Sequence, residues 1–198
     1  MLVEKRFNTC SVERKTSETC IRIELKSDGE GAFSGSTQIG FFDHMLKTFC
    51  KFSTLSLKVE SFELDSKTDL HHGVEDFGII LGTAFKELFD YSQLARFGHA
   101  IVPMDEALIV ASVDLSGRPF LNYQVRFETE RVGEFPIELF EEFFKSFASN
   151  AKITLHLVQL YGKNSHHIAE ACFKSFAIAL RSAIERSESI QSTKGMID

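Results

Sequence analysis

The sequence contains the motif HHxxE twice, at residues 71–75 (HHGVE) and 166–170 (HHIAE). On a helix, each histidine of such a motif lies within one turn of the glutamate, at i, i+3 or i, i+4. Adjacent histidines, however, point about 100° apart around the helix axis. They are therefore badly placed to chelate one ion and well placed to serve two ions side by side. Two helices of this kind predict a dinuclear metal site.

The residue types around the motifs restrict the class of metal. No cysteine lies next to either motif, which argues against a structural thiolate zinc site. The four cysteines are far apart and form no CxxC pair, so we interpret them as reduced thiols: Cys10, Cys20, Cys50 and Cys172. Imidazole and carboxylate ligands suit Mn²⁺, Fe²⁺, Co²⁺ or Zn²⁺, and ligand type alone leaves that choice open.

A further ligand is predicted at His44, in the helical pattern FFDHML. The equivalent position 98 residues later holds Glu142, and a carboxylate is an acceptable Mn²⁺ ligand. The competing candidate is His156, which is the better ligand type but lies on a predicted strand. Its equivalent in the first half is Lys58, so we interpret His156 as lying outside the metal shell.

These residues belong to elements that occur twice along the chain. GFFDHMLKTF matches ELFEEFFKSF, and LSLKV matches ITLHL, both at an offset of 98, whereas the HHxxE segments are offset by 95. Each half also begins with two runs that we expect to pair as a hairpin, around Asp28-Gly29 in the first half and Ser116-Gly117 in the second. The runs are residues 19–25 with 31–39, and 107–115 with 119–127.

The order in each half is thus strand, strand, helix, strand, helix. We predict an α+β fold made by internal duplication, with two sheets and helices packed on one face. The whole chain, residues 1–198, is expected to form a single domain of two repeats, about 1–95 and 96–190, followed by a C-terminal tail.

Composition excludes several classes of protein. The chain has 22 basic and 28 acidic residues, a formal net charge of −6, and no Lys/Arg-rich run, which disfavours sequence-independent nucleic-acid binding. No stretch of 18 apolar residues is present to span a membrane, and the start, MLVEKRFNTC, lacks the apolar run of a signal peptide. We therefore expect a cytoplasmic protein without nucleic-acid or membrane partners.

Longer segments of the chain follow one family in order. They are TSET (16–19), GFFDHML, HHxVED, RFG (96–98), PMDEAL (103–108), DLSGRP (114–119), NSHHIxEAxFKSFAxALR and STKG (192–195). By these motifs the chain resembles imidazoleglycerol-phosphate dehydratase, a carbon–oxygen hydro-lyase of histidine biosynthesis. The resemblance implies a 24-subunit homo-oligomer with sites between subunits, two Mn²⁺ ions per site, and loss of water from imidazole glycerol phosphate to give imidazole acetol phosphate.

The resemblance also implies roles for individual residues. Metal ligands are expected at His44, His71, His72, Glu75, His166, His167 and Glu170. The repeat, and not the resemblance, adds Glu142 as the residue that completes the shell. Catalytic groups are expected at Glu18, Glu75, Glu170 and Asp105, with Glu106 as an alternative to Asp105. Substrate contacts are expected at Arg96, Arg118, Lys174, Ser192 and Lys194, together with Glu18, His44, His71, His72, Glu75 and His166.

Two positions depart from the family pattern. The family often has histidine where Glu142 stands, and commonly has histidine at the position of Phe52, which is not a ligand. The phosphate contacts have some independent support. Lys174 lies four residues after Glu170 and so shares its helix face, and Arg118 adjoins a turn that can hold its guanidinium group in place.

The implied substrate is an imidazole that carries a dihydroxypropyl phosphate chain. Its C–H has no neighbouring carbonyl, and hydroxide is a poor leaving group. Metal coordination favours the imidazolate, which can expel the hydroxyl group next to the ring and give a diazafulvene-type intermediate. Acid/base residues must protonate the leaving oxygen and remove the carbon proton, and Glu18 is the first candidate.

Two other classes of protein share parts of the pattern. A phosphatase or amidohydrolase also uses two metal ions, but such sites draw on several aspartates at strand ends. Here Asp43, Asp69 and Asp76 form no such array. A metal-dependent assembly protein, in which ions join subunits, would have no activity for Glu18→Gln to remove.

Overall fold

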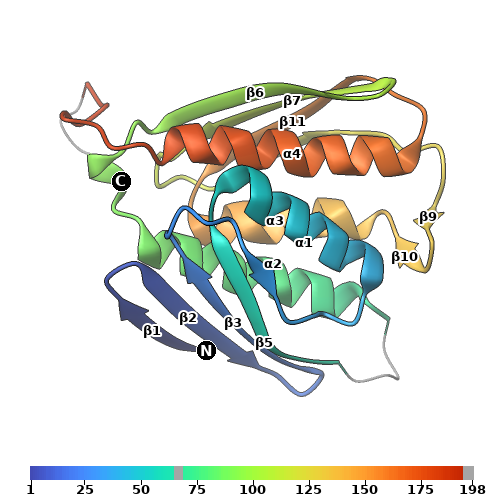
Figure 1. Cartoon of the computed structure of the whole chain (residues 1–198), viewed down its shortest axis with the longest axis horizontal. Helices are drawn as coiled ribbons and strands as arrows, with labels where there is room; N and C mark the ends of the chain where they lie inside the picture. Colours follow the sequence, from blue (N-terminus) through green and yellow to red (C-terminus); the bar gives the residue numbers. More distant parts are fainter. Residues whose placement is uncertain (65–68, 194–198) are drawn as a thin grey trace.

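Two β-sheets enclose a layer of α-helices in the computed structural model, which describes residues 1–64 and 69–193 (Figure 1). The first half contains β1 (Leu2–Arg6), β2 (Thr9–Lys15), β3 (Thr19–Lys26), β4 (Phe33–Ser34), α1 (Gly40–Ser53), β5 (Ser56–Leu64) and α2 (His71–Leu88), followed by a 3₁₀ turn, η1 (Tyr91–Gln93). The second half contains β6 (Phe97–Met104), β7 (Ala107–Asp114), β8 (Phe120–Gln124), β9 (Arg131–Val132), β10 (Phe135–Pro136), α3 (Leu139–Ala151), β11 (Thr154–Tyr161) and α4 (Ser165–Ala183).

Four strands of each large sheet have the same topology, and the first sheet adds β1 at its edge. One has the strand order β1-β2-β3-β5-β4 and the other β6-β7-β11-β8. In each sheet, an antiparallel hairpin (β2–β3 or β6–β7) lies beside the strand that comes after the first helix in the chain (β5 or β11). A shorter strand (β4 or β8) pairs parallel with that strand at the far edge of the sheet. The helices α1 and α3 also end alike, at Thr54 and Lys152 in the left-handed conformation. The fold class and the internal duplication predicted from the sequence are confirmed.

The two predicted hairpins are wrong. Within 31–39 only Phe33–Ser34 forms a strand, and it pairs parallel with β5 rather than antiparallel with β3. In 119–127, β8 pairs parallel with β11. Parallel partners need a long crossover, which α1 and α3 supply. The hairpins are instead β2–β3 and β6–β7, and their first strands were missed.

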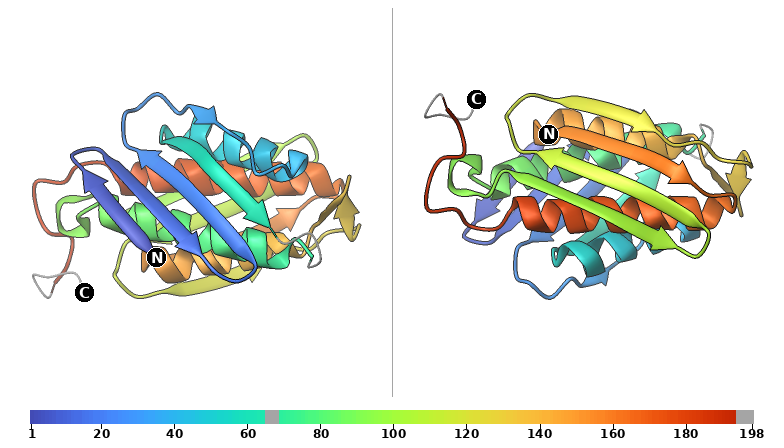
Figure 2. Two further views of the ribbon diagram at one scale, coloured as in Figure 1. Left: turned by 90° about the horizontal axis from the view of Figure 1, so that it is seen from below. Right: turned by 90° about the horizontal axis from the view of Figure 1, so that it is seen from above.

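The helices lie on one face of each sheet, as predicted, and these faces look toward each other; Figure 2 shows each sheet from its outer side. Helix α2 packs on β2 and β3, and α4 packs on β6 and β7. Between the sheets, α1 contacts α4 and α2 contacts α3, so each helix pair joins the two halves. Phenylalanines fill this layer, for example Phe42 against Phe143 with ring centroids 5.4 Å apart.

Glycines permit the closest backbone approaches. A Cβ atom on Gly98 of β6 would lie 1.9 Å from the carbonyl oxygen of Ala179 on α4. On α2, a Cβ atom on Gly78 would lie 2.7 Å from the carbonyl oxygen of Phe143 on α3. Only a residue without a side chain fits at such distances. None of the described helices has both the length and the apolar character needed to cross a membrane.

Candidate functional site

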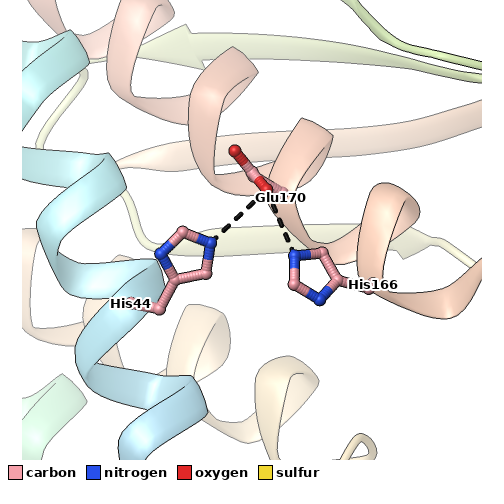
Figure 3. A group of neighbouring side chains, drawn as sticks. All are labelled: His44, His166 and Glu170. Carbon is pink, nitrogen blue, oxygen red and sulfur yellow. Dashed lines mark ion pairs between the residues drawn. The ribbon is translucent and has the colours of Figure 1, made fainter.

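One group of potential metal ligands joins the two halves of the chain. His44 on α1 and His166 on α4 both direct Nε2 at Oε2 of Glu170, at 3.4 Å and 3.3 Å (Figure 3). Ligand atoms of these residues all lie within 4.8 Å of one another. Neighbouring ligands of an octahedral ion with bonds of about 2.2 Å lie about 3 Å apart. The two His–Glu distances are close to that value, and imidazole and carboxylate are donor types that suit a divalent ion such as Mn²⁺.

Glu170 is held in its ionised form. Burial by itself would raise the pKa of this carboxyl group, but the Lys174 ammonium and His44 outweigh that effect, and the pKa lies below its ordinary value. Lys174 Nζ is 2.9 Å from Glu170 Oε1, and both side chains are largely buried. The i, i+4 spacing thus places Lys174 on the same helix face as Glu170, as predicted.

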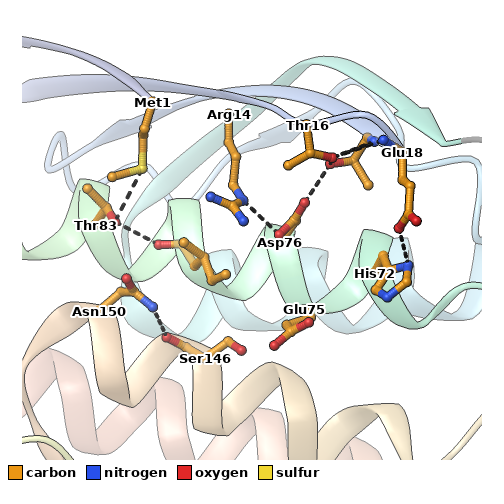
Figure 4. Close-up of polar contacts among 12 residues, drawn as sticks. Met1, Arg14, Thr16, Glu18, His72, Glu75, Asp76, Thr83, Ser146 and Asn150 are labelled. Carbon is orange, nitrogen blue, oxygen red and sulfur yellow. Dashed lines mark hydrogen bonds and ion pairs between the residues drawn. The ribbon is translucent and has the colours of Figure 1, made fainter.

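The first half presents the equivalent residues at the beginning of α2. His71 Nε2 is 3.9 Å from Glu75 Oε2, which is the same i, i+4 pair as His166 and Glu170. His72 Nδ1 is 2.5 Å from Oε2 of Glu18 (Figure 4). The side chains of both pairs are well exposed. No ion pair between described residues joins this set to His44, His166 or Glu170.

The turn that carries Glu18 is fixed to α2 by the side chains of Thr19 and Arg14. Thr16 Oγ1 accepts hydrogen bonds from the backbone N–H groups of Glu18 and Thr19. The Thr19 hydroxyl donates to the buried carboxylate of Asp76, at 2.5 Å, and Arg14 Nε donates to the same carboxylate at 2.7 Å (Figure 4). Asp76 follows Glu75, so one helical turn of α2 positions both Glu75 and the Glu18 turn.

His167 has a different set of partners. Its Nδ1 lies 2.7 Å from Oε2 of Glu106, and its Nε2 lies 3.6 Å from Oδ2 of Asp105. The hydrogen bond from His167 lowers the pKa of Glu106 to about 2, helped by backbone N–H groups, and the same bond raises the pKa of His167. The backbone N–H groups of the two HHxxE helices are capped alike, by Asp69 at His71 and by Asn164 at His166.

Three other predicted site residues have partners within the chain. Arg96 forms a two-point contact with Asp114, at 2.6 Å and 3.1 Å, and donates to the carbonyl of Gln191. Glu142 is 3.3 Å from Lys145 Nζ, one turn along α3. Arg118 is exposed in the loop between β7 and β8, where Nη1 is 3.4 Å from the Ser116 carbonyl oxygen.

The remaining predicted residues lie away from these clusters or outside the description. Ser192 follows Gln191, whose carbonyl Arg96 contacts, so the Ser192 backbone lies near Arg96. Lys194 falls outside the described residues. His156 lies on β11 between the buried residues Leu155 and Leu157, so it points to the sheet face away from the helices, where its ring meets Phe120. This orientation favours the interpretation of His156 as a non-ligand.

Several residues that organise the site were missed in the sequence. Four polar residues fix the turn of Glu18 and the start of α4, and nothing in their local sequence marks them: Arg14, Thr16, Asp76 and Asn164. Glu106 was considered only as an acid/base group, although its contacts are with His167 and a backbone loop. The internal repeat carries a signal that could have revealed the role of Glu106. Glu106 directly precedes β7, just as Glu18 directly precedes β3, the equivalent strand of the first half.

Comparisons with known proteins bear out the family resemblance of the sequence. A family model described as "Imidazoleglycerol-phosphate dehydratase" matches residues 37–180. Curated proteins of that name are similar over nearly the whole chain. The protein from Thermotoga neapolitana is 49% identical and both chains are covered completely; the one from Caldanaerobacter subterraneus is 50% identical over 94% of this chain and 97% of its own.

Two solved structures have the same architecture. Imidazoleglycerol-phosphate dehydratase from Staphylococcus aureus superposes with a TM-score of 0.81 at 36% identity, covering 90% of this chain and 99% of that one. IGPD from Pyrococcus furiosus superposes with a TM-score of 0.83 at 36% identity, covering 94% of this chain and 100% of that one.

Proposed function

The chain belongs to the imidazoleglycerol-phosphate dehydratase family, enzymes that dehydrate imidazoleglycerol phosphate in histidine biosynthesis, and from this premise we propose that it does so with two divalent metal ions per active site. One observation carries the proposal. Both halves present two imidazoles and a carboxylate at the start of a helix, with the first histidine and the glutamate within 4 Å in each. When bound, the ions would favour the imidazolate form of the substrate ring. Mn²⁺ is the metal we propose.

Glu18 is the residue we propose for proton transfer. The Glu18 carboxylate is exposed, and one of its oxygens lies 2.5 Å from Nδ1 of His72. It could therefore give a proton to, or take one from, a substrate carbon or oxygen that lies beside it. Loss of the hydroxyl group from the substrate would give a diazafulvene-type intermediate, whose next C–H is acidic enough for a carboxylate base. Asp105 is exposed and 3.6 Å from His167, which makes it the second proton-transfer candidate.

We propose that the complete site forms between subunits of a large homo-oligomer, of 24 copies by family resemblance. The observation in favour is the separation of ligands into two sets within one chain. His44, His166 and Glu170 form one set, and the His71–Glu75 and His72–Glu18 pairs form another. A second copy of the chain would bring the first set of one subunit to the second set of its neighbour.

The substrate phosphate requires cationic groups near these ligands. Arg118 is the best placed of the predicted contacts, because its side chain is exposed in a short loop. Lys174 is bound to Glu170, at 2.9 Å, so it would reach the phosphate from the metal-binding face of α4. Arg96 and the segment around Ser192 are joined by a hydrogen bond, and would act together with Lys194.

The proposed function is tested by assaying the purified protein with imidazole glycerol phosphate after chelation and after addition of Mn²⁺. Formation of imidazole acetol phosphate only with metal, and its loss in Glu18→Gln, supports the proposal. Release of inorganic phosphate instead would indicate a metal-dependent phosphatase. Metal-dependent assembly without turnover would indicate a purely structural role for the ions.

A further inference from the structure

The duplication places a glutamate at the same position of both halves. Glu18 is the residue before β3, and Glu106 is the residue before β7, its equivalent in the second sheet. Each glutamate contacts Nδ1 of the second histidine of an HHxxE motif. The distances are 2.5 Å from Glu18 to His72 and 2.7 Å from Glu106 to His167. The two contacts are therefore equivalent under the internal duplication.

This contact determines which ring nitrogen can bind a metal. An ionised carboxylate only accepts hydrogen bonds, so Nδ1 of the neutral histidine carries the proton and donates it to the glutamate. The lone pair then resides on Nε2, which is the nitrogen directed away from the glutamate. Carboxylates that fix the tautomer of a metal-binding histidine in this way contribute substantially to metal affinity.

The two copies of the interaction differ in how the carboxylate is held. Oε1 of Glu106 accepts hydrogen bonds from the backbone N–H groups of Asn164, at 2.7 Å, and Lys163, at 3.2 Å. Both oxygens of Glu106 are therefore engaged. Among the described residues, the carboxylate of Glu18 contacts His72 alone, and only the backbone of its turn is fixed, by Thr16. The Glu106 carboxylate is thus held at both oxygens, and the Glu18 carboxylate at one.

We propose that Glu106 is a positioning residue, which holds His167 in the tautomer and orientation that a metal ion needs, and that it takes no part in proton transfer. Proton transfer then falls to Glu18, whose carboxylate is held at one oxygen and leaves the other available. This inference rests on the proposed function, because it assigns a role toward the proposed metal ions. It replaces the acid/base role that the sequence suggested as an alternative for Glu106.

Glutamine substitutions distinguish the role of Glu106 from the role of Glu18. In Glu106→Gln the amide oxygen must stay on the N–H groups of Lys163 and Asn164, so the amide NH₂ faces Nδ1 of His167. That histidine must then accept at Nδ1 and carry its proton on Nε2, the wrong tautomer for a ligand. In the matched control Glu18→Gln the amide can rotate and present its oxygen to His72. The same substitution is thus predicted to weaken metal binding by His167 in Glu106→Gln and to leave metal binding by His72 intact in Glu18→Gln.

The measurement is Mn²⁺ binding to the full-length protein, followed by the electron paramagnetic resonance signal of free Mn²⁺, with the melting temperature of the metal-free protein recorded alongside. We expect Glu106→Gln to weaken one Mn²⁺ ion by about 10- to 100-fold at an unchanged melting temperature. Glu18→Gln is expected to lose turnover while its Mn²⁺ affinity changes by less than about threefold, well below the effect of losing a histidine-orienting carboxylate.

Three results would overturn the inference. Normal Mn²⁺ affinity in Glu106→Gln together with a lower kcat would make Glu106 a proton-transfer residue. A lower melting temperature of the metal-free variant would make it an anchor for the loop before α4. If the wild type binds two Mn²⁺ ions and Glu106→Gln binds both with wild-type affinity, this inference fails and the proposed function stands. If the wild type binds no Mn²⁺, the proposed metal dependence fails as well.

Discussion

At the scale of single residues, the structure separates two arginines that family resemblance treats alike. Arg96 is largely buried against Asp114, so Arg96→Ala should reduce the free energy of unfolding by about 1–3 kcal/mol through lost charge-assisted hydrogen bonds. Arg118 is exposed, so Arg118→Ala should change that free energy by no more than about 0.5 kcal/mol. If Arg118 binds phosphate, KM should rise about tenfold, as expected for one such bond. Urea unfolding and steady-state kinetics of both variants check this; destabilisation by Arg118→Ala at normal KM would contradict it.

The two candidates for the last metal ligand also differ at this scale. Glu142 occupies the repeat position of His44, whereas His156 points to the outer face of its sheet. Glu142→Ala is therefore expected to weaken one of the two Mn²⁺ ions selectively, and His156→Ala to leave both unchanged. Metal titrations of the two variants distinguish the candidates. The opposite pattern would mean that the duplication does not define the ligand set.

At the scale of elements, the sheet–helix contact depends on Gly98. Because a Cβ atom there would lie 1.9 Å from the Ala179 carbonyl oxygen, Gly98→Ala must push β6 away from α4. We expect a loss of about 3 kcal/mol or more, or no soluble protein. Gly40 at the start of α1 has open space around its Cβ position, so Gly40→Ala is the control and should be neutral or stabilising by up to about 1 kcal/mol. Thermal unfolding of both variants measures the difference.

Local patterns explain which elements the sequence predicts correctly. The four helices and strands β3, β5, β7 and β11 follow from apolar periodicity, and the i, i+4 pair of each HHxxE motif follows from helix geometry. Strand partners do not follow, because alternation shows which face is buried and not which neighbour is paired. That is why β4 and β8 were assigned to hairpins. Strand β1 is exposed along its whole length, so it carries no burial signal.

The same limit applies to the site. The ligand types at His44 and Glu170 are evident in the sequence, yet their meeting depends on the packing of α1 against α4. The anchoring of Glu106 depends on backbone groups 57 and 58 residues further along the chain. Backbone donors have no sequence signature, so this part of the site requires the fold.

At the scale of the whole molecule, metal removal is expected to act on assembly as well as on activity. If the two ligand sets meet across subunits, the ions bridge neighbouring copies. Chelation should then abolish turnover and shift the oligomer toward smaller species, and Mn²⁺ should reverse both effects. Light scattering before and after chelation measures the change. An oligomer of unchanged mass without metal would mean that protein contacts alone hold the subunits together.

The pairing of α1 with α4 and of α2 with α3 has a consequence for the ancestry of the chain. In each half, the helix face turned away from its own sheet is covered by helices of the other half. A polypeptide of half this length would leave that apolar face exposed, and pairing with an identical copy as a homodimer would cover it. Such a homodimer would carry the same glutamate before the second hairpin strand of both copies. The different roles proposed above for Glu18 and Glu106 would then date from after the two copies were joined into one chain.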